Sequence, residues 1–360
     1  MTISEEITSL ISQKYFLKQY IFDNLLVKEN DLSEKELCDC LLEFSNAYIC
    51  IQIKEKDSSS SLPPEEWLAK KVFKNAKKQI RDTFSFIRNE ANTIFSKGKE
   101  FCVDRNKTII PIIVFVNPDV KYYQRITTSR YIDVPVNIFS YEDFKTMMET
   151  IVMPYDIINY VIYRTVFKES ERGKIIIDEV SDENTLIARP KTEQDYAQLF
   201  LARSYIPQLR KHNIHESEIE LYNEIVSNLN ESNGSKRCGF IEGLMRTDYI
   251  GAARIARNWR SLVFATKEER FVAPFCISLE ERLYMFAVHP HTMSDEEYNY
   301  RINLCAAYKK YKEGYKILHL LTFQKEASDQ YSVSLADADL EEEFPYESLI
   351  EDALKLFEED

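Results

Sequence analysis

Hydrophobic and polar positions along the first part of the chain predict a helix, a hairpin and a second helix. Apolar residues recur at helical spacing from Ser4 to Val27, with Ser4 as the N-cap. Residues 36–44 and 47–54 read as two strands joined by a turn at Ser45 and Asn46. After a loop rich in serine and proline, the sequence PPEEW begins a helix that we expect to extend to about Ser96.

Two further strands and a helix complete the predicted first domain. Residues 108–118 are apolar at nearly every position, which is typical of a strand buried between helices. A short strand at 134–139 and a helix from about Tyr141 follow. This order predicts an α/β domain, which we place at residues 1–170.

The second half has a different order of elements. Helical spacing predicts three helices at its start, at 194–209, 216–229 and 239–264. Two predicted strands, 282–290 and 316–324, then flank a helix at 295–312. We therefore expect residues 171–360 to form a second domain of the α/β or α+β type.

Charge is distributed unevenly along the chain. The net charge is −13, from 46 basic and 59 acidic residues, and an even distribution would disfavour a nucleic-acid partner. Residues 337–360 hold eleven acidic residues and one basic residue, Lys355. The acidic and basic residues of the remaining chain are therefore nearly equal in number. We expect this acidic end to be a solvated tail and helix face, with autoinhibition or partner docking as the alternative.

Three polar side chains interrupt the predicted hairpin. A turn at residues 45–46 places Asp39 opposite Gln52, and Leu37 opposite Lys54. Opposed side chains leave the same face of a sheet about 5 Å apart. Lys54 leaves that face too, because side chains alternate along a strand. Asp39, Gln52 and Lys54 are therefore predicted to converge on one patch.

This group of side chains suits phosphodiester hydrolysis. A carboxylate and an amide oxygen can share a hard cation such as Mg²⁺ or Mn²⁺. The cation lowers the pKa of a bound water, and the Lys54 ammonium can orient that water or stabilise the transition state. The alternative is a salt bridge between Asp39 and Lys54 at a strand end, with Gln52 hydrogen-bonded to a loop.

Asp39, twelve intervening residues and then Gln52-Ile53-Lys54 resemble the core of the PD-(D/E)xK nuclease superfamily, in the QxK variant of Mrr-like restriction endonucleases. The resemblance covers roughly residues 1–165. It implies a restriction-endonuclease-like mixed sheet flanked by helices. It also implies that Asp39 and Gln52 bind Mg²⁺ and that Lys54 is the catalytic base or positions the water.

Four further residues are candidates for this site. Glu36 belongs to the same sequence pattern, and Glu5 or Glu6 could supply the first-helix glutamate that many members of the superfamily carry. Gln79 resembles a polar residue that some members place nearby.

A basic segment follows the hairpin, and we expect it to contact nucleic-acid phosphates. At three- and four-residue steps its side chains form one stripe opposite an apolar face, with a merely solvated helix face as the alternative. The basic residues are Lys70, Lys71, Lys74, Lys77, Lys78 and Arg81. The apolar residues are Trp67, Val72, Phe73, Ala76 and Ile80.

We interpret the remaining cysteine, histidine and arginine residues mainly as structural. The seven cysteines contain no C-x-x-C and predict neither a zinc site nor a disulfide framework. We expect His289, His291 and His319 to be loop and core residues, with a second acid/base site as the alternative. Arg254, Arg257 and Arg260, with Trp259, are expected to pack at the edge of the core. Residues 122–125 could border a substrate groove.

The sequence thus predicts a metal-dependent nuclease that hydrolyses nucleic acid, DNA rather than RNA. The resemblance implies a bacterial restriction or antiviral defence effector. The second half would bind a protein partner, recognise substrate or form a homo-oligomer. Because Gln52 replaces an acidic residue, an inactive nuclease-fold scaffold or binding subunit is the alternative. A third interpretation is an enzyme centred on the three histidines.

The chain is expected to be cytoplasmic. Its start, MTISEEITSL, lacks the basic and apolar regions of a signal peptide. No stretch approaches eighteen consecutive apolar residues, so no membrane partner is expected.

Overall fold

The chain folds into two compact units, Met1–Pro207 and Gln208–Asp360. The structure, a computed structural model, describes residues 6–7, 10–11, 20–29, 33–44, 46–89, 92–96, 99–129, 132–151, 153–166, 175–177, 186–188, 192–201, 214–234, 238–279, 281–326, 330–341 and 346–358. The first unit extends past the expected boundary at residue 170. The reason is that Glu193 lies buried in this unit, where it accepts hydrogen bonds from Tyr160 and Arg164.

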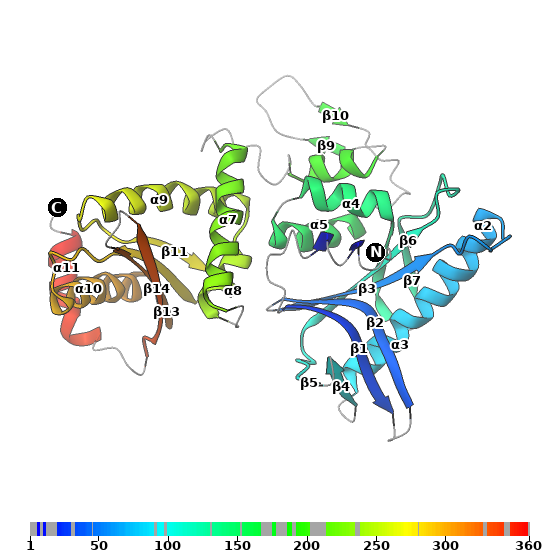
Figure 1. Ribbon diagram of the computed structural model, residues 1–360, viewed down its shortest axis with the longest axis horizontal. Coiled ribbons are helices and arrows are strands. Elements are labelled where there is room, and N and C mark those ends of the chain that lie inside the picture. The colour runs from blue at the N-terminus through cyan, green and yellow to red at the C-terminus, as the bar shows by residue number, and fades with distance from the viewer. Residues whose placement is uncertain are drawn as a thin grey trace. The chain divides into compact units, whose positions relative to one another are not determined.

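An eight-stranded mixed sheet forms the centre of the first unit, in the order β5-β4-β1-β2-β3-β6-β8-β7 (Figure 1). The strands are β1 (Ile21–Glu29), β2 (Ser33–Glu43), β3 (Ala47–Glu55), β4 (Thr93–Ser96), β5 (Lys99–Phe101), β6 (Thr108–Val116), β7 (Ile126–Ser129) and β8 (Ile132–Ser140). Strands β1, β2 and β3 are antiparallel, whereas β3, β6 and β8 run parallel. The predicted hairpin and the two strands after it are confirmed, and the unit is α/β.

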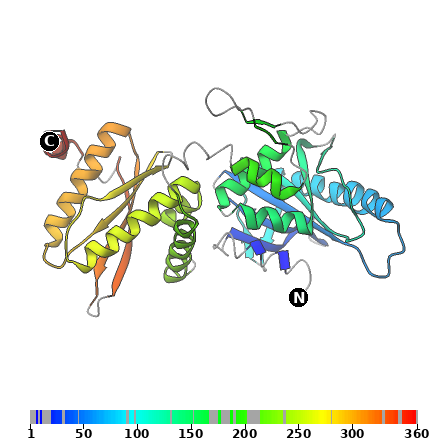
Figure 2. The ribbon, with the colours of Figure 1, turned by 90° about the horizontal axis from the view of Figure 1, so that it is seen from above.

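Helices cover both faces of this sheet (Figures 1 and 2). Helix α2 (Pro64–Trp67), the π-helix η2 (Leu68–Ala76) and α3 (Lys77–Arg88) follow one another and pack on one face. Helices α4 (Tyr141–Thr150) and α5 (Pro154–Val166) pack on the other. A short two-stranded sheet, β9 (Ile175–Ile177) and β10 (Leu186–Ala188), also belongs to this unit.

Two predicted helix ends in this unit are wrong. The first helix was expected to reach Val27, but residues 21–29 form β1, where Leu25 and Val27 alternate into the core and the backbone pairs with β2 and β4. The described residues 6–7 and 10–11 are helical, as predicted. The later helix ends at Arg88 rather than near Ser96, because residues 93–96 pair with β1 as strand β4.

The second unit contains a four-stranded sheet in the order β11-β12-β13-β14. The strands are β11 (Phe275–Leu279), β12 (Arg282–Val288), β13 (Ile317–Lys325) and β14 (Tyr331–Asp339). The helices are α7 (Glu216–Ser232), α8 (Gly239–Met245), α9 (Tyr249–Lys267), α10 (Asp295–Glu313) and α11 (Tyr346–Glu358). Strands β12 and β13 are parallel and flank α10 in the sequence, as predicted.

Two expectations for the second unit need correction. The helix expected at 239–264 is divided into α8 and α9, because the Asp248 side chain accepts from the Gly251 N–H and begins a new helix. The described part of the acidic end is not a solvated tail. Asp337 and Asp339 lie in β14, and Ala353 of α11 is buried against Leu304 and Ala307 of α10. Among the described residues no helix is long and apolar enough to span a bilayer.

Candidate functional site

Strands β2 and β3 pair in the expected register and then separate. Cys40 pairs with Ile51 and Glu43 pairs with Tyr48, as a two-residue turn requires. The Phe44 N–H donates to the Ala47 carbonyl over 2.8 Å and closes that turn. The ladder between the two strands ends at the Cys40–Ile51 pair. The predicted Asp39–Gln52 pair thus falls just beyond the ladder, where side chains can enter between the strands.

The Asp39 carboxylate occupies this opening. Its Oδ2 atom accepts a hydrogen bond of 2.5 Å from the Ile53 N–H, which has no β2 carbonyl opposite it in the ladder. The Lys54 ammonium lies 3.8 Å from the same oxygen and donates to the Ile53 carbonyl over 2.8 Å. Asp39 and Lys54 are therefore brought together, as the spacing predicted, with both side chains partly exposed.

A β-bulge in β2 holds Gln52. Leu25 of β1 pairs with Cys38 and Leu26 pairs with Glu36, so Leu37 is the extra residue. The Leu37 carbonyl lies 3.4 Å from the Gln52 Nε2 atom, so the amide oxygen of Gln52 is its remaining ligand atom. Leu37 does not pair with Lys54, contrary to the prediction, because the bulge displaces it.

Thr83 is a site residue that sequence reasoning missed. The hydroxyl of this buried residue on α3 also donates to the Leu37 carbonyl. One backbone oxygen thus connects α3, the bulge and the buried side chain of Gln52. No local sequence signal could identify Thr83, since the contact joins residues 46 positions apart.

Gln52 and Lys54 lie on the sheet face that η2 and α3 cover. Tyr48 and Cys50 belong to the core beneath these helices, and side chains two residues apart on a strand share a face. The three predicted residues therefore meet at the margin of a helix-covered face, next to the place where β2 and β3 separate.

Glu36 adds a second carboxylate to this cluster. Burial raises the pKa of the Glu36 carboxyl, the Asp39 carboxylate raises it further, and Lys54 lowers it. The part of this shift that comes from Asp39 reflects repulsion between the two acids. A cation between them would relieve that repulsion.

The oxygen atoms here fit a magnesium ion that keeps several of its waters. Two carboxylates and an amide oxygen are hard ligands of the type that Mg²⁺ prefers. Throughout the described residues, no group of three or more His, Cys, Asp or Glu side chains is arranged to hold a metal. The candidate site would offer such an ion the carboxylates of Asp39 and Glu36 and the amide oxygen of Gln52.

The remaining acidic and amide candidates lie elsewhere or outside the described part. The Glu6 carboxylate contacts the Tyr141 hydroxyl at the start of α4, and burial and this carboxylate raise the pKa of Tyr141. Glu5 lies outside the described residues. The Gln79 side chain is exposed, and its backbone carbonyl lies 2.9 Å from the Thr83 hydroxyl.

The basic segment keeps its apolar face, but part of it departs from the α-helical geometry on which the predicted stripe is based. Trp67, Val72, Ala76 and Ile80 are buried and Phe73 is partly buried, as predicted. Residues 68–76 form a π-helix, which has more residues per turn than an α-helix and so rotates the later side chains out of line. The sequence periodicity could not show this change.

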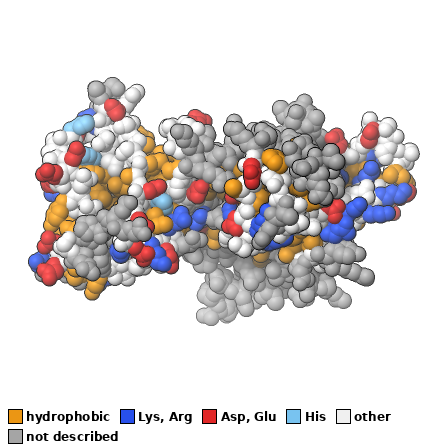
Figure 3. All heavy atoms as spheres, turned by 90° about the horizontal axis from the view of Figure 1, so that it is seen from below, with side chains coloured by type: hydrophobic (Ala, Val, Ile, Leu, Met, Phe, Trp, Pro, Cys, Tyr) orange, Lys and Arg blue, Asp and Glu red, His pale blue; other side chains and the backbone are white. Residues whose placement is uncertain are grey.

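The basic side chains consequently have different partners. The Lys77 ammonium donates to the Thr128 carbonyl over 2.6 Å, and Arg81 is paired with Asp82 at 2.8 Å. Lys70 is paired with Glu66 at 2.5 Å. Lys71, Lys74 and Lys78 are exposed, and Figure 3 shows Lys and Arg side chains gathered at the side of the view where Figure 1 draws α2 and α3.

The three histidines of the second unit have separate partners. His289 stacks on Tyr298, with 4.2 Å between ring centroids, and His291 Nε2 lies 2.7 Å from the Lys325 carbonyl. His319 Nδ1 lies 2.6 Å from Asp337 Oδ1. The described contacts do not bring these imidazoles together as a catalytic group.

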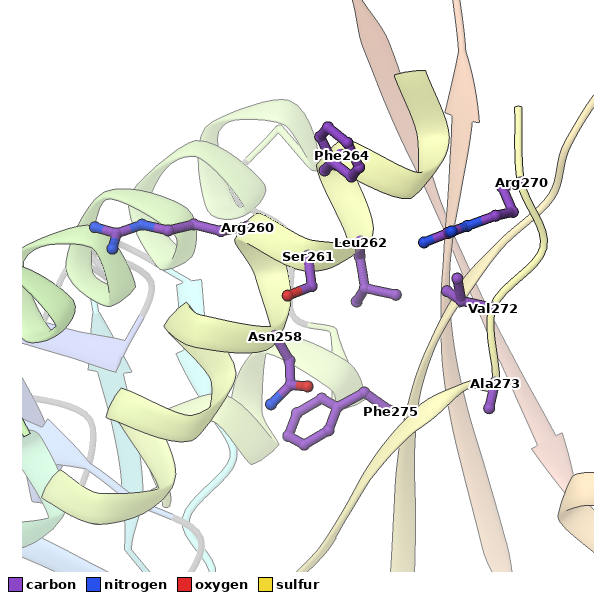
Figure 4. A pocket seen from close by; sticks show the side chains of 9 residues that line it. All are labelled: Asn258, Arg260, Ser261, Leu262, Phe264, Arg270, Val272, Ala273 and Phe275. Carbon is purple, nitrogen blue, oxygen red and sulfur yellow. The ribbon is translucent and has the colours of Figure 1, made fainter. Parts of the chain in front are cut away.

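The arginine-rich helix α9 borders a pocket of about 480 Å³ (Figure 4). Trp259 packs on Phe323 in the core, and Arg257 forms an ion pair with Glu218, which confirms core-edge packing for these two. Figure 4 shows Arg260 pointing away from the other lining side chains, whereas Arg270 extends toward α9. The residues that line it include no acid, histidine or cysteine.

Comparison of the chain with protein-family models, with curated proteins and with solved structures found no match.

Proposed function

We propose that the protein is a Mg²⁺-dependent nuclease of the PD-(D/E)xK type that hydrolyses DNA with its first unit. The observation that carries this proposal is the meeting of Asp39 Oδ2 with the Ile53 N–H and the Lys54 ammonium where β2 and β3 separate. A mixed sheet covered by helices on both faces is compatible with a restriction-endonuclease-like domain. The resemblance also supports a bacterial restriction or antiviral defence role.

Each residue of the cluster has a distinct task in this proposal. Asp39, Glu36 and the Gln52 amide oxygen would hold Mg²⁺. When bound, the cation supplies charge neutralisation at the phosphate and a water of lowered pKa. The Ile53 N–H fixes the Asp39 carboxylate, and the Leu37 carbonyl fixes the Gln52 amide. The Lys54 ammonium orients the attacking water or stabilises the negative charge that develops on the phosphate.

The alternative is an inactive nuclease-fold subunit that acts through protein partners. Its supporting observation is Gln52, a neutral amide where the superfamily pattern has an acid, so that only the carboxylates of Asp39 and Glu36 lie at this site among the described residues. An amide oxygen carries no net charge, so this site attracts a divalent cation less strongly than three carboxylates would.

The two functions differ in DNA cleavage. Full-length protein is incubated with supercoiled plasmid and with single-stranded circular DNA in Mg²⁺, in Mn²⁺ and in EDTA. The nuclease proposal expects nicked or linear product with metal and none in EDTA. Intact DNA under all metal conditions, from protein with a cooperative unfolding transition, would favour the scaffold alternative.

A further inference from the structure

The loop between β6 and β7 presents one tyrosine to solvent and anchors the next. Tyr122 is 93% exposed. Tyr123 accepts a hydrogen bond of 3.1 Å from the Ser140 N–H, and its hydroxyl donates to the Asp143 carboxylate. Burial raises the pKa of Tyr123 well above its ordinary value, so the hydroxyl stays protonated and keeps this donor role. The exposed Tyr122 ring thus directly precedes a residue whose side chain is anchored.

This loop leaves the sheet beside the candidate site. Lys54 of β3 and Phe115 of β6 are direct partners across a parallel pair, so their side chains leave the same face. The Phe115 ring packs edge-on against Tyr123, with 4.9 Å between centroids. Because β3 and β6 run parallel, the segments that follow them emerge at one edge of the sheet. Tyr122 therefore stands at the edge where Lys54 lies.

Basic side chains lie next to Tyr122 in the sequence and on elements that follow or pack on β3 and β6. Lys121 is exposed next to Tyr122. The Lys56 ammonium, just beyond β3, neutralises Asp119 of the same loop over 2.7 Å. Helix η2 packs on β3 and β6 and carries the exposed Lys71 and Lys74. An exposed aromatic ring among cations is the arrangement that binds single-stranded nucleic acid, in which lysines meet phosphates and bases stack on rings.

We propose that Tyr122 stacks on an unpaired base and that the substrate reaches the Asp39–Lys54 site as single-stranded DNA. The inference rests on the proposed function, which it refines by naming the substrate class. In a duplex both faces of each base are covered by neighbouring base pairs, so a loop tyrosine finds a free face only on an unpaired nucleotide. Nothing in the interior depends on the Tyr122 ring, so its replacement should leave the fold intact.

The test measures binding without cleavage. Fluorescence anisotropy is recorded for full-length protein with a labelled single strand, and with the duplex of equal length, at low salt in EDTA. Stacking of one base predicts that Tyr122→Ala weakens single-strand binding roughly five- to a hundred-fold, while Tyr122→Phe keeps it. Tyr311→Ala is the matched control, since Tyr311 is an exposed tyrosine of the second unit at 52%. Duplex binding should be the same for all four proteins.

Three results would overturn the inference: unchanged single-strand affinity in Tyr122→Ala, an equal loss for single strand and duplex, or no single-strand binding by the unsubstituted protein. The proposed function is tested separately by adding Mg²⁺ to the same complexes. If the protein binds the single strand through Tyr122 but does not cleave it, the nuclease proposal is refuted and the stacking role of Tyr122 is retained.

Discussion

The Asp39 carboxylate on β2 accepts a hydrogen bond of 2.5 Å from the Ile53 N–H on β3, just beyond the Cys40–Ile51 pair that ends the ladder. This contact gives a backbone donor the partner that the separating strand no longer provides. It also holds the carboxylate beside Lys54, at 3.8 Å from the ammonium. The separation of β2 and β3 thus allows one hydrogen bond to position the proposed metal ligand Asp39.

Replacing Lys54 by methionine should separate cleavage from metal binding. Lys54→Met keeps the length of the side chain and removes the cation next to Asp39. We expect DNA cleavage to fall about a hundred-fold or more. Affinity for Mn²⁺ should rise, because a competing positive charge is gone. Calorimetric titration and cleavage of single-stranded circular DNA check the two effects.

Lys145→Met is the control, since Lys145 lies on α4 at the other face of the sheet and is paired with Glu149 at 4.0 Å on the exposed surface. It should leave cleavage within about two-fold, because screened surface pairs contribute little. Equal losses in the two variants would point to a general loss of positive charge and against a specific role for Lys54.

Thr83 should act on the site through Leu37 and Gln52. Thr83→Val keeps the shape and removes the hydroxyl that donates to the Leu37 carbonyl. We expect a loss of about 1 kcal/mol in the free energy of unfolding and a higher Mg²⁺ concentration for half-maximal cleavage. Urea unfolding and a Mg²⁺ titration of the cleavage rate measure these changes.

Thr83→Ser retains the hydroxyl and should restore the magnesium dependence. A valine variant with lower stability but an unchanged magnesium dependence would restrict Thr83 to a structural role.

Glu36 should make stability fall with rising pH. Its pKa is raised above the ordinary 4.5, so the protonated form is favoured by the folded state. This contribution is present at low pH and is lost as the pH rises from about 4.5 through the raised pKa. Without metal, Glu36→Gln should therefore unfold at the same or a higher temperature than the unsubstituted protein at pH 7.

With magnesium at pH 7, the unsubstituted protein should have a higher unfolding temperature than Glu36→Gln. The added ion should raise the unfolding temperature of the unsubstituted protein more than that of Glu36→Gln, because only the carboxylate can act as an anionic ligand. Thermal unfolding between pH 4 and pH 8, with and without Mg²⁺, provides the measurement. An equal magnesium response in both proteins would remove Glu36 from the ligand set.

Deleting residues 337–360 should damage the second unit. As a solvated tail, this segment could be removed to raise DNA affinity at low salt. In the structure Asp337 and Asp339 end strand β14, and Ala353 of α11 is buried against α10. We therefore expect the truncated protein to lose its cooperative unfolding transition, monitored by circular dichroism. A truncated protein with unchanged stability would show that these contacts contribute nothing.

Elements with one strong periodicity were predictable from the sequence. The apolar run of β6 and the hairpin with its turn at residues 45–46 have the expected places, and so does α10 between two strands. The meeting of Asp39 and Lys54 followed from the hairpin alone, because the residues that fix its register lie close together in the sequence.

Features that depend on distant partners were not predictable. Leu25 fits a helical and a strand pattern equally well, and pairing with β4, which is some 70 residues away, decides in favour of the strand. The bulge at Leu37 and its contact with Thr83 also require the assembled sheet. The apolar spacing does not indicate the π-helix at residues 68–76, and the contact of Lys77 with Thr128 joins residues 51 positions apart.

The central claim is tested most directly by cleavage of single-stranded circular DNA in Mg²⁺ by the unsubstituted protein and by Asp39→Asn. Asparagine retains an acceptor for the Ile53 N–H, so the free energy of unfolding should change by no more than about 1 kcal/mol. Asp57→Asn, in an exposed loop, is the control. We predict cleavage by the unsubstituted protein and the control, and none by Asp39→Asn. Full cleavage by folded Asp39→Asn would contradict the assignment of the site.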